Sequence, residues 1–276
     1  MSEREPAAER HDRMMREERE QAERLRSDRA DADIWKGNAG RFHPVDVAED
    51  PAVAPLAELA GPDSTAIDVG AGGGRHAVPL GRRLRKVVAV EPSPAMREVL
   101  DEAIRSAGVT NVTVVPIRWE EAEVRPAELV FAANVTYGIP RIEPFLRKID
   151  RTATRAAALV AFANPPQQVI APFWKAVYGE ERLRLPCRDE LLDVLREFGA
   201  EPKVIDLPPQ EVRSFGIPEE AFAELRRRVY AGVGTAAEER LRAAMPNLTV
   251  ERDGELWPRE DEPNPRSIIW WKPVRR

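Results

Sequence analysis

Two carboxylates and a run of glycines form the part of this sequence whose residue types and spacing best suit chemistry. Asp68 precedes Gly70 by two positions, glycines also occupy positions 72–74, and Glu91 ends the next apolar run. Glycine lets a chain turn sharply out of a strand and lets a ligand lie against the backbone. A carboxylate at the tip of the following strand can accept hydrogen bonds from both hydroxyl groups of a ribose. These residues therefore predict a binding site for a ligand that contains adenosine.

The elements around these residues have to position them. A short apolar run that begins at Ala66 predicts a strand, residues 75–85 have the spacing of a helix, and residues 87–90 predict a second strand. A strand, a glycine loop, a helix and a further strand make half of a nucleotide-binding βαβ unit. Glu91 then stands at the tip of the second strand.

The acid before the glycines distinguishes between two kinds of ligand. A dinucleotide motif, G-x-G-x-x-G, that begins at Gly70 needs a small residue at its sixth position for helix–strand packing, and Arg75 stands there. Asp68 would repel a pyrophosphate, whereas it can pair with the ammonium group of an amino acid, directly or through water. An NAD-dependent oxidoreductase is an alternative that Asp68 and Arg75 both disfavour.

These motifs resemble those of the class I S-adenosylmethionine-dependent methyltransferases, of the bacterial small-molecule type. The resemblance is carried by Asp68–Arg75 (DVGAGGGR), Val90–Ser93 (VEPS) and Met96, and it extends over about residues 63–162. It implies S-adenosylmethionine as the cofactor, S-adenosylhomocysteine as the product, and no metal. The residues that it places around the cofactor are Asp68, Gly70, Ala71, Gly72, Glu91, Pro92, Met96, Trp119, Glu120, Ala133 and Asn134.

The adenine contact departs from the family pattern. Arg118 stands where related enzymes carry an acid that binds the adenine amino group. Glu120 is therefore expected to serve instead, with Trp119 lying on the adenine face. In the alternative interpretation, Trp119 belongs to the core and Glu120 is solvated.

For the side of the site that would bind the methyl acceptor, the sequence gives only candidate residues. By the resemblance, Tyr137 faces the acceptor, and His43 lies in a segment that closes over the cofactor, where it is a candidate base. His76 is expected to be structural. Methyl transfer mainly needs alignment and exclusion of water, and a general base helps only when the acceptor starts protonated. No catalytic residue is assigned.

The apolar segments and the resemblance together predict a doubly wound α/β fold. Continuous apolar runs, typical of buried parallel strands, occur at residues 112–117, 128–134, 156–162, 203–207 and 267–272. We expect a Rossmann-like seven-stranded sheet, mostly parallel, in which the last strand runs antiparallel between the fifth and the sixth. An N-terminal helix and a C-terminal helical insertion, with one helix over residues 219–244, complete the prediction.

Four segments are expected along the chain. Residues 1–50 form a charged helix, interpreted as solvated, and a possible cofactor lid; the alternative is that this helix packs over the cleft or onto a second subunit. Residues 51–207 form the cofactor-binding core. Residues 208–266 form an insertion that covers the substrate mouth. Residues 267–276 form the last core strand and a tail.

The composition of the chain limits the kinds of partner and site that we expect. A net charge of −5 argues against wholesale binding to nucleic acid or to an anionic membrane. Cys187 is the single cysteine, so an internal disulfide and a C-x-x-C metal site are excluded. The charged N-terminus lacks the pattern of a signal peptide, and no apolar run approaches a membrane span. We expect a soluble, cytoplasmic monomer or homodimer.

These observations predict an enzyme that transfers a methyl group from S-adenosylmethionine to a small-molecule acceptor by in-line displacement. Besides the oxidoreductase, the alternative is a non-catalytic S-adenosylmethionine-binding protein, which would bind the cofactor without transferring its methyl group.

Overall fold

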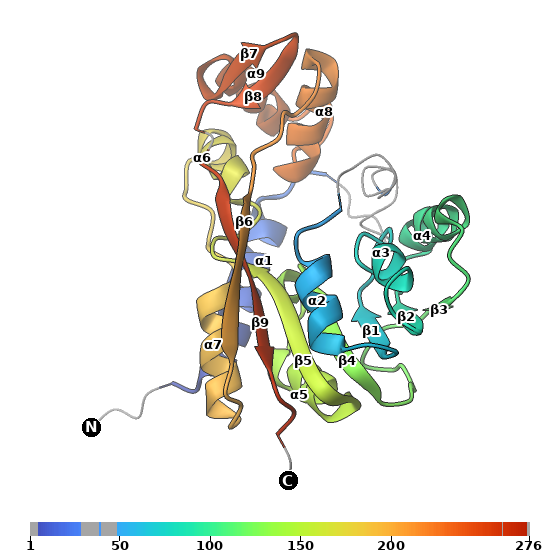
Figure 1. Cartoon of the computed structure of the whole chain (residues 1–276). Helices are drawn as coiled ribbons and strands as arrows, with labels where there is room; N and C mark the ends of the chain where they lie inside the picture. Colours follow the sequence, from blue (N-terminus) through green and yellow to red (C-terminus); the bar gives the residue numbers. More distant parts are fainter. Residues whose placement is uncertain (1–4, 29–38, 40–48, 261, 275–276) are drawn as a thin grey trace.

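A seven-stranded sheet runs through the computed structural model, which describes residues 5–28, 39, 49–260 and 262–274 (Figure 1). The strands lie in the order β3-β2-β1-β4-β5-β9-β6, and all neighbours are parallel except β9, which is antiparallel to β5 and to β6. The predicted Rossmann-like sheet, with its last strand inserted between the fifth and the sixth, is thereby confirmed. The strands are β1 (Thr65–Val69), β2 (Lys86–Val90), β3 (Val112–Val115), β4 (Ala127–Ala133), β5 (Ala153–Phe162), β6 (Lys203–Gln210) and β9 (Asn264–Trp271).

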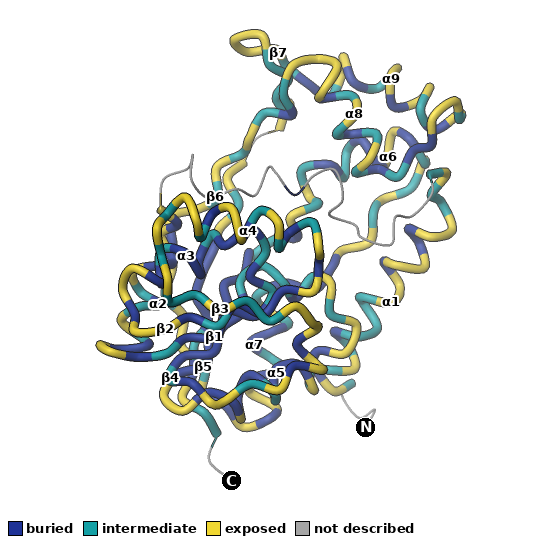
Figure 2. The backbone as a smooth tube through the Cα atoms, turned by 90° about the vertical axis from the view of Figure 1, so that its right-hand side faces the viewer, coloured by how far each residue is buried: buried dark blue, intermediate teal, exposed yellow. Residues whose placement is uncertain are grey.

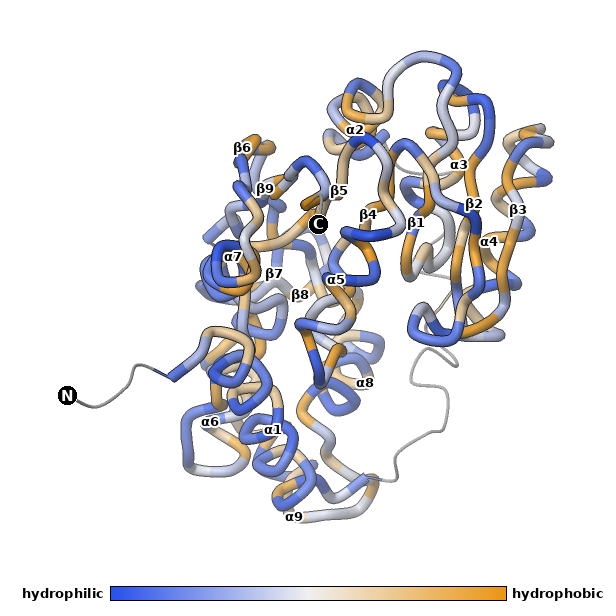
Figure 3. Tube along the Cα trace, turned by 90° about the horizontal axis from the view of Figure 1, so that it is seen from below, coloured by the Kyte–Doolittle hydropathy of each residue, from blue (hydrophilic) through white to orange (hydrophobic). Residues whose placement is uncertain are grey.

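Helices cover both faces of the sheet. One face packs against α2 (Val53–Ala60), α3 (Ala77–Gly81) and α4 (Pro94–Ala107). The other packs against α1 (Ala7–Leu25), α5 (Ile142–Thr152) and α7 (Arg188–Glu197). Side chains of a strand alternate between the faces, so both sides of the central strands are apolar, as the orange segments of the strands in Figure 3 show.

A second apolar core lies beyond the carboxyl end of β5 (Figures 1 and 2). We call the elements around it the cap. They are α6 (Ala171–Tyr178), which follows a 3-10 turn at Gln168–Ile170, α8 (Pro218–Arg228), α9 (Ala236–Leu248), and the hairpin β7 (Thr249–Arg252) and β8 (Glu255–Pro258). The cap thus draws on residues before position 208 as well as on the expected insertion.

The helix predicted over residues 219–244 is two helices. The chain leaves α8 through Tyr230, which has a φ of 57°, and Gly234, which has a φ of 73°, before Thr235 caps α9. The hairpin that follows was not predicted. Its turn, Asp253-Gly254, has positive φ at both positions, as a two-residue hairpin turn requires.

The helix α1 is not a fully solvated helix. Its Ala7 and His11 are buried, with Ala7 in the core under α5 and α7, and its Ala22 is buried in the core of the cap. Glu18 is buried too, and it pairs with Arg182 at 3.0 Å. Its sequence looks hydrophilic because its buried face includes polar residues that find partners. The helix therefore bridges the sheet domain and the cap.

None of the helices in the described part of the chain combines the length and the apolar content that a bilayer crossing would require.

Candidate functional site

The glycine loop leaves β1 at the carboxyl edge of the sheet and is tied to β2. The N–H groups of Gly70 and Ala71 both point to the carbonyl of Val90, at 2.8 and 3.2 Å. Gly70 has a φ of 72°, and a Cβ there would lie 2.7 Å from a methyl carbon of Val135. At Gly72, with a φ of 55°, a Cβ would meet nothing within 4 Å. The loop therefore offers bare backbone to open space at Gly72.

Glu91 is fixed beside this loop. One carboxylate oxygen accepts from the Gly72 N–H and the other from the Ser93 N–H, each at 2.8 Å. Ser93 also caps α4, because its hydroxyl accepts from the Met96 N–H at 3.2 Å. These two backbone bonds fix the Glu91 carboxylate at the tip of β2. Pro92 is exposed at this strand tip, whereas Met96 is buried under it.

Asp68 is the unusual group of the site. It lies on the sheet face covered by α2, α3 and α4, with Ala89 and Phe131 as its Cα partners on the two neighbouring strands. It is 1% exposed, and neither carboxylate oxygen has a hydrogen-bond partner among the described residues. A buried charge without a partner is costly, so a cationic group of a ligand would stabilise it.

Burial raises the pKa of Asp68 to about 7. The neighbouring His76 opposes this shift, and the charge of Glu91 adds to it. The Ala77 N–H also faces the carboxylate and lowers its pKa, without the geometry of a hydrogen bond. The site therefore contains one carboxylate, Glu91, fixed by backbone donors, and a second, Asp68, for which the described residues provide no hydrogen bond of good geometry.

An ion-pair cluster that the sequence did not reveal lies next to the loop. Arg266, on β9, donates two hydrogen bonds to Asp50, and Arg75 donates one at 2.6 Å. The Ala52 N–H donates a fourth at 2.9 Å. Burial opposes ionisation of Asp50, but His76 and Arg266 outweigh it and hold its pKa well below the usual range. Residue spacing carries no signal for this cluster, since its members come from distant parts of the chain.

The exit of β4 forms the other side of the site. Ala133 ends the strand, and Asn134 follows with a φ of 57° and its side-chain oxygen buried without a partner among the described residues. The Thr136 hydroxyl, which the sequence analysis did not single out, is likewise buried and unpartnered. Together these groups give this side of the site hydrogen-bonding capacity that the described part of the chain does not use.

Tyr137 is held at the end of β5. Its hydroxyl accepts from the Phe162 N–H at 2.8 Å, and its ring stacks on that of Phe162 with centroids 6.4 Å apart. Burial raises the pKa of Tyr137 well above its usual value, so the phenol is neutral near pH 7. Its contact with an acceptor stays a prediction.

The placement of Trp119 favours the core interpretation. Trp119 is 3% exposed within the apolar core on the α5 side of the sheet, and the Lys148 ammonium lies 4.7 Å from its ring centroid. This burial leaves little ring surface for an adenine. Glu120 is exposed, and its role at the adenine stays a prediction. His43 lies outside the described residues.

The comparisons with known proteins agree with this geometry. Residues 66–155 match a family model described as a methyltransferase domain. Over these residues the chain is similar to that family. No curated protein sequence matches the chain at a significant level.

Two solved structures share the fold of the sheet and of the elements around it. The YcgJ protein from Bacillus subtilis is 13% identical with a TM-score of 0.56, and the match covers 81% of this chain and 99% of that one. A putative methyltransferase from Bacillus halodurans C-125 is 18% identical with a TM-score of 0.55, covering 80% and 99%. At these identities the likeness concerns the fold.

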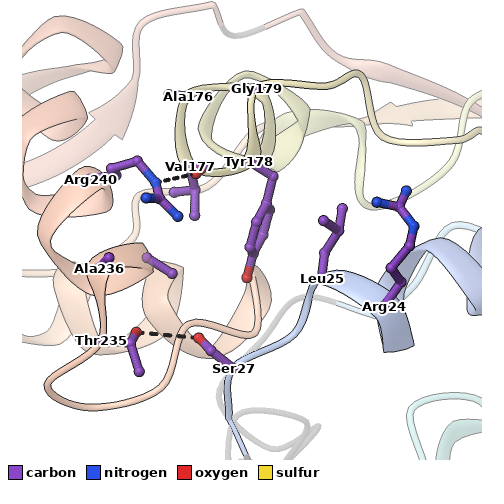
Figure 4. Close-up of a pocket in the computed structure, with 11 residues that line it drawn as sticks. Arg24, Leu25, Ser27, Ala176, Val177, Tyr178, Gly179, Thr235, Ala236 and Arg240 are labelled. Carbon is purple, nitrogen blue, oxygen red and sulfur yellow. Dashed lines mark hydrogen bonds between the residues drawn. The ribbon is translucent and has the colours of Figure 1, made fainter.

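A pocket also lies between α1, α6 and the start of α9 (Figure 4). Its lining includes Arg24, Tyr178 and Arg240, and the Arg240 side chain donates to the Val177 carbonyl. Neither the glycine loop nor Asp68 nor Glu91 belongs to its lining. Within the described ranges, no group of three or more His, Cys, Asp or Glu residues is arranged to hold a metal ion.

Proposed function

We propose that this chain uses S-adenosylmethionine to methylate a small molecule. The observation that carries the proposal is the buried Asp68 carboxylate, unpartnered among the described residues, beside a glycine loop to which Glu91 is hydrogen-bonded. S-adenosylmethionine carries both groups that these acids need, an ammonium and a ribose diol. NADH carries the diol but brings a pyrophosphate toward Asp68, which that acid would repel.

The chain's own residues would act mainly by binding and orientation. When bound, S-adenosylmethionine supplies a methyl group on a positively charged sulfur, which the lone pair of an acceptor displaces in line as a neutral thioether leaves. Asp68 pairs with the ammonium group, and Glu91 accepts from the ribose hydroxyls. The open backbone at Gly72 admits the ligand. Such positioning, with exclusion of water, accounts for most of the catalysis that this reaction needs.

The acceptor is proposed to be small and to carry a polar group. The Asn134 oxygen and the Thr136 hydroxyl are buried without partners in the described structure, and both follow β4. A polar acceptor would satisfy such groups, whereas a hydrocarbon would leave them unpaired. The net charge of −5 weighs against nucleic acid as the acceptor.

Calorimetric titration with S-adenosylmethionine, S-adenosylhomocysteine and NADH tests the cofactor. We expect the first two to bind and NADH to give no heat. Asp68→Asn should weaken the binding of S-adenosylmethionine and of S-adenosylhomocysteine. Asp150→Asn should not, because Asp150 is a buried carboxylate that accepts hydrogen bonds from Trp271 and Val274 instead. Binding of NADH alone would favour the oxidoreductase alternative.

Transfer is tested with S-adenosylmethionine that carries a labelled methyl group. The protein and the labelled cofactor are incubated with a cell extract, which is then separated into small molecules and macromolecules. Label in the small-molecule fraction, absent with Asp68→Asn, supports the proposal. Tight cofactor binding without label in either fraction would favour the non-catalytic alternative, and label in macromolecules would contradict the small acceptor.

A further inference from the structure

The imidazole of His76 lies beside Asp50, on the sheet face from which Asp68 projects. Its Nε2 is 3.7 Å from an oxygen of Asp50, and its ring meets the Phe131 ring edge-on, with centroids 6.1 Å apart. Phe131 is the Cα partner of Asp68 on the neighbouring strand, so both side chains stand on the same face of the sheet. His76 therefore covers the face from which Asp68 projects. It is 5% exposed.

Hydrogen bonds hold Asp50 in place beside this imidazole. Arg266 donates to both of its oxygens, at 2.6 and 3.0 Å, Arg75 donates at 2.6 Å, and the Ala52 N–H donates at 2.9 Å. Asp50 and Arg266 are both buried, at 2% and 3% exposed. The negative charge that faces His76 from this side is therefore fixed by three elements of the fold.

We propose that His76, held by Asp50, is a positioning residue that keeps the Asp68 carboxylate charged for the ammonium group of the cofactor. The inference rests on the proposed function, because it assigns a role within the same site. His76 takes no part in methyl transfer, and it acts only through Asp68.

The electrostatics of the cluster support this role. Burial and the nearby Glu91 both raise the pKa of Asp68, whereas His76 lowers it. When Asp68 binds a proton it becomes neutral and loses its attraction for an ammonium. Without His76, Asp68 would keep its proton to a higher pH, and cofactor binding would have to release that proton to solvent.

The test compares two ligands that differ in one part. S-adenosylhomocysteine carries the ammonium group, whereas 5′-methylthioadenosine carries the adenosine and the thioether without the amino acid. In His76→Gln, we expect the affinity for S-adenosylhomocysteine to fall about tenfold at pH 6.5 and to recover by pH 8.5. The affinity for methylthioadenosine should stay within about twofold at both pH values.

His11→Gln is the matched control. His11 is also a buried histidine with its Nε2 unpartnered among the described residues, but it lies on α1 beside Asp12, away from the glycine loop. It should leave the affinities for both ligands unchanged. His76→Asn serves as a second variant if His76→Gln does not fold, with the same expected result.

Each possible outcome of this test either supports or overturns the role inferred for His76. Equal weakening of both ligands in the His76 variants means a merely structural role and overturns the inference, as does unchanged binding of both. A loss confined to S-adenosylhomocysteine but independent of pH also overturns it. Failure of the wild-type protein to bind S-adenosylhomocysteine at any pH overturns the proposed function itself, and the inference with it.

Discussion

Arg266 donates hydrogen bonds of 2.6 and 3.0 Å to the two carboxylate oxygens of Asp50, although 216 positions separate the two residues in the sequence. The pair connects β9 to the segment before α2, and Arg75 ties the same acid to the glycine loop. A bidentate contact between a guanidinium and a carboxylate is among the strongest side-chain hydrogen bonds. β9, the last strand in the sequence, thus helps to hold the glycine loop that follows β1.

Arg266→Met should therefore lower the free energy of unfolding by about 3 kcal/mol, because it leaves a buried carboxylate short of a partner. Urea unfolding monitored by fluorescence measures the change. Arg105→Met is the control, since Arg105 pairs with Glu102 on the exposed surface of α4 and should cost under about 1 kcal/mol. Similar losses in the two variants would show that the buried pair contributes no more to the free energy of unfolding than an exposed pair does.

Glu91→Gln should weaken the binding of S-adenosylhomocysteine by about 1–3 kcal/mol, and it should also lower the stability, because one backbone donor loses its partner. The amide cannot accept from both Gly72 and Ser93, and it loses the charge that strengthens bonds to ribose hydroxyls. Calorimetry measures the affinity. Glu128→Gln is the control, because Glu128 also accepts from a backbone N–H, that of Thr65, but at the start of β1. Equal affinities for wild type and Glu91→Gln would place the ribose elsewhere.

Asp68 predicts an unusual dependence of stability on pH. Its pKa is about 7 in the folded protein, against an ordinary value of 3.8. Between those values the folded state holds a proton that the unfolded state lacks, so stability falls as pH rises through this window, by at most about 4 kcal/mol. Asp68→Asn cannot titrate and should lose less stability between pH 5 and pH 8. Urea unfolding across that range tests this, and parallel profiles for the two proteins would contradict it.

Tyr137→Phe should cost about 1–3 kcal/mol of stability and leave cofactor affinity unchanged. The substitution removes the oxygen that accepts from the Phe162 N–H and leaves that donor unpaired. Thermal unfolding and calorimetry with S-adenosylhomocysteine measure the two quantities. A large loss of affinity with unchanged stability would mean that the hydroxyl belongs to the cofactor contact instead.

The arrangement of the glycine loop, Asp68 and Glu91 at one edge of the sheet could be predicted because its signals are local. The glycines, Asp68 and Glu91 lie within one βαβ unit, where the turn between strand and helix restricts the residue types. The continuous apolar runs likewise predicted the strands, since strands buried on both faces need apolar residues at every position. The place of β9 between β5 and β6 came from the family resemblance rather than from its residues.

The ion-pair cluster could not be predicted. The chain has 42 Lys and Arg residues and 47 Asp and Glu residues, and nothing in their types selects Arg266 as the partner of Asp50. The packing of α1 was missed for a related reason, because polar residues such as Glu18 are buried only where a distant partner meets them. The β7–β8 hairpin, by contrast, carried a readable signal in Asp253-Gly254.

The place of β9 in the sheet also has a consequence for the order in which the protein is made. A ribosome completes β5 and β6 well before β9, and 100 positions separate Asn164 from its hydrogen-bond partner Asn264. Until β9 is synthesised, β5 has an unpaired edge and Asp50 lacks its Arg266 partner. The nascent chain therefore passes through a stage with an open, apolar sheet edge, of the kind that chaperones protect.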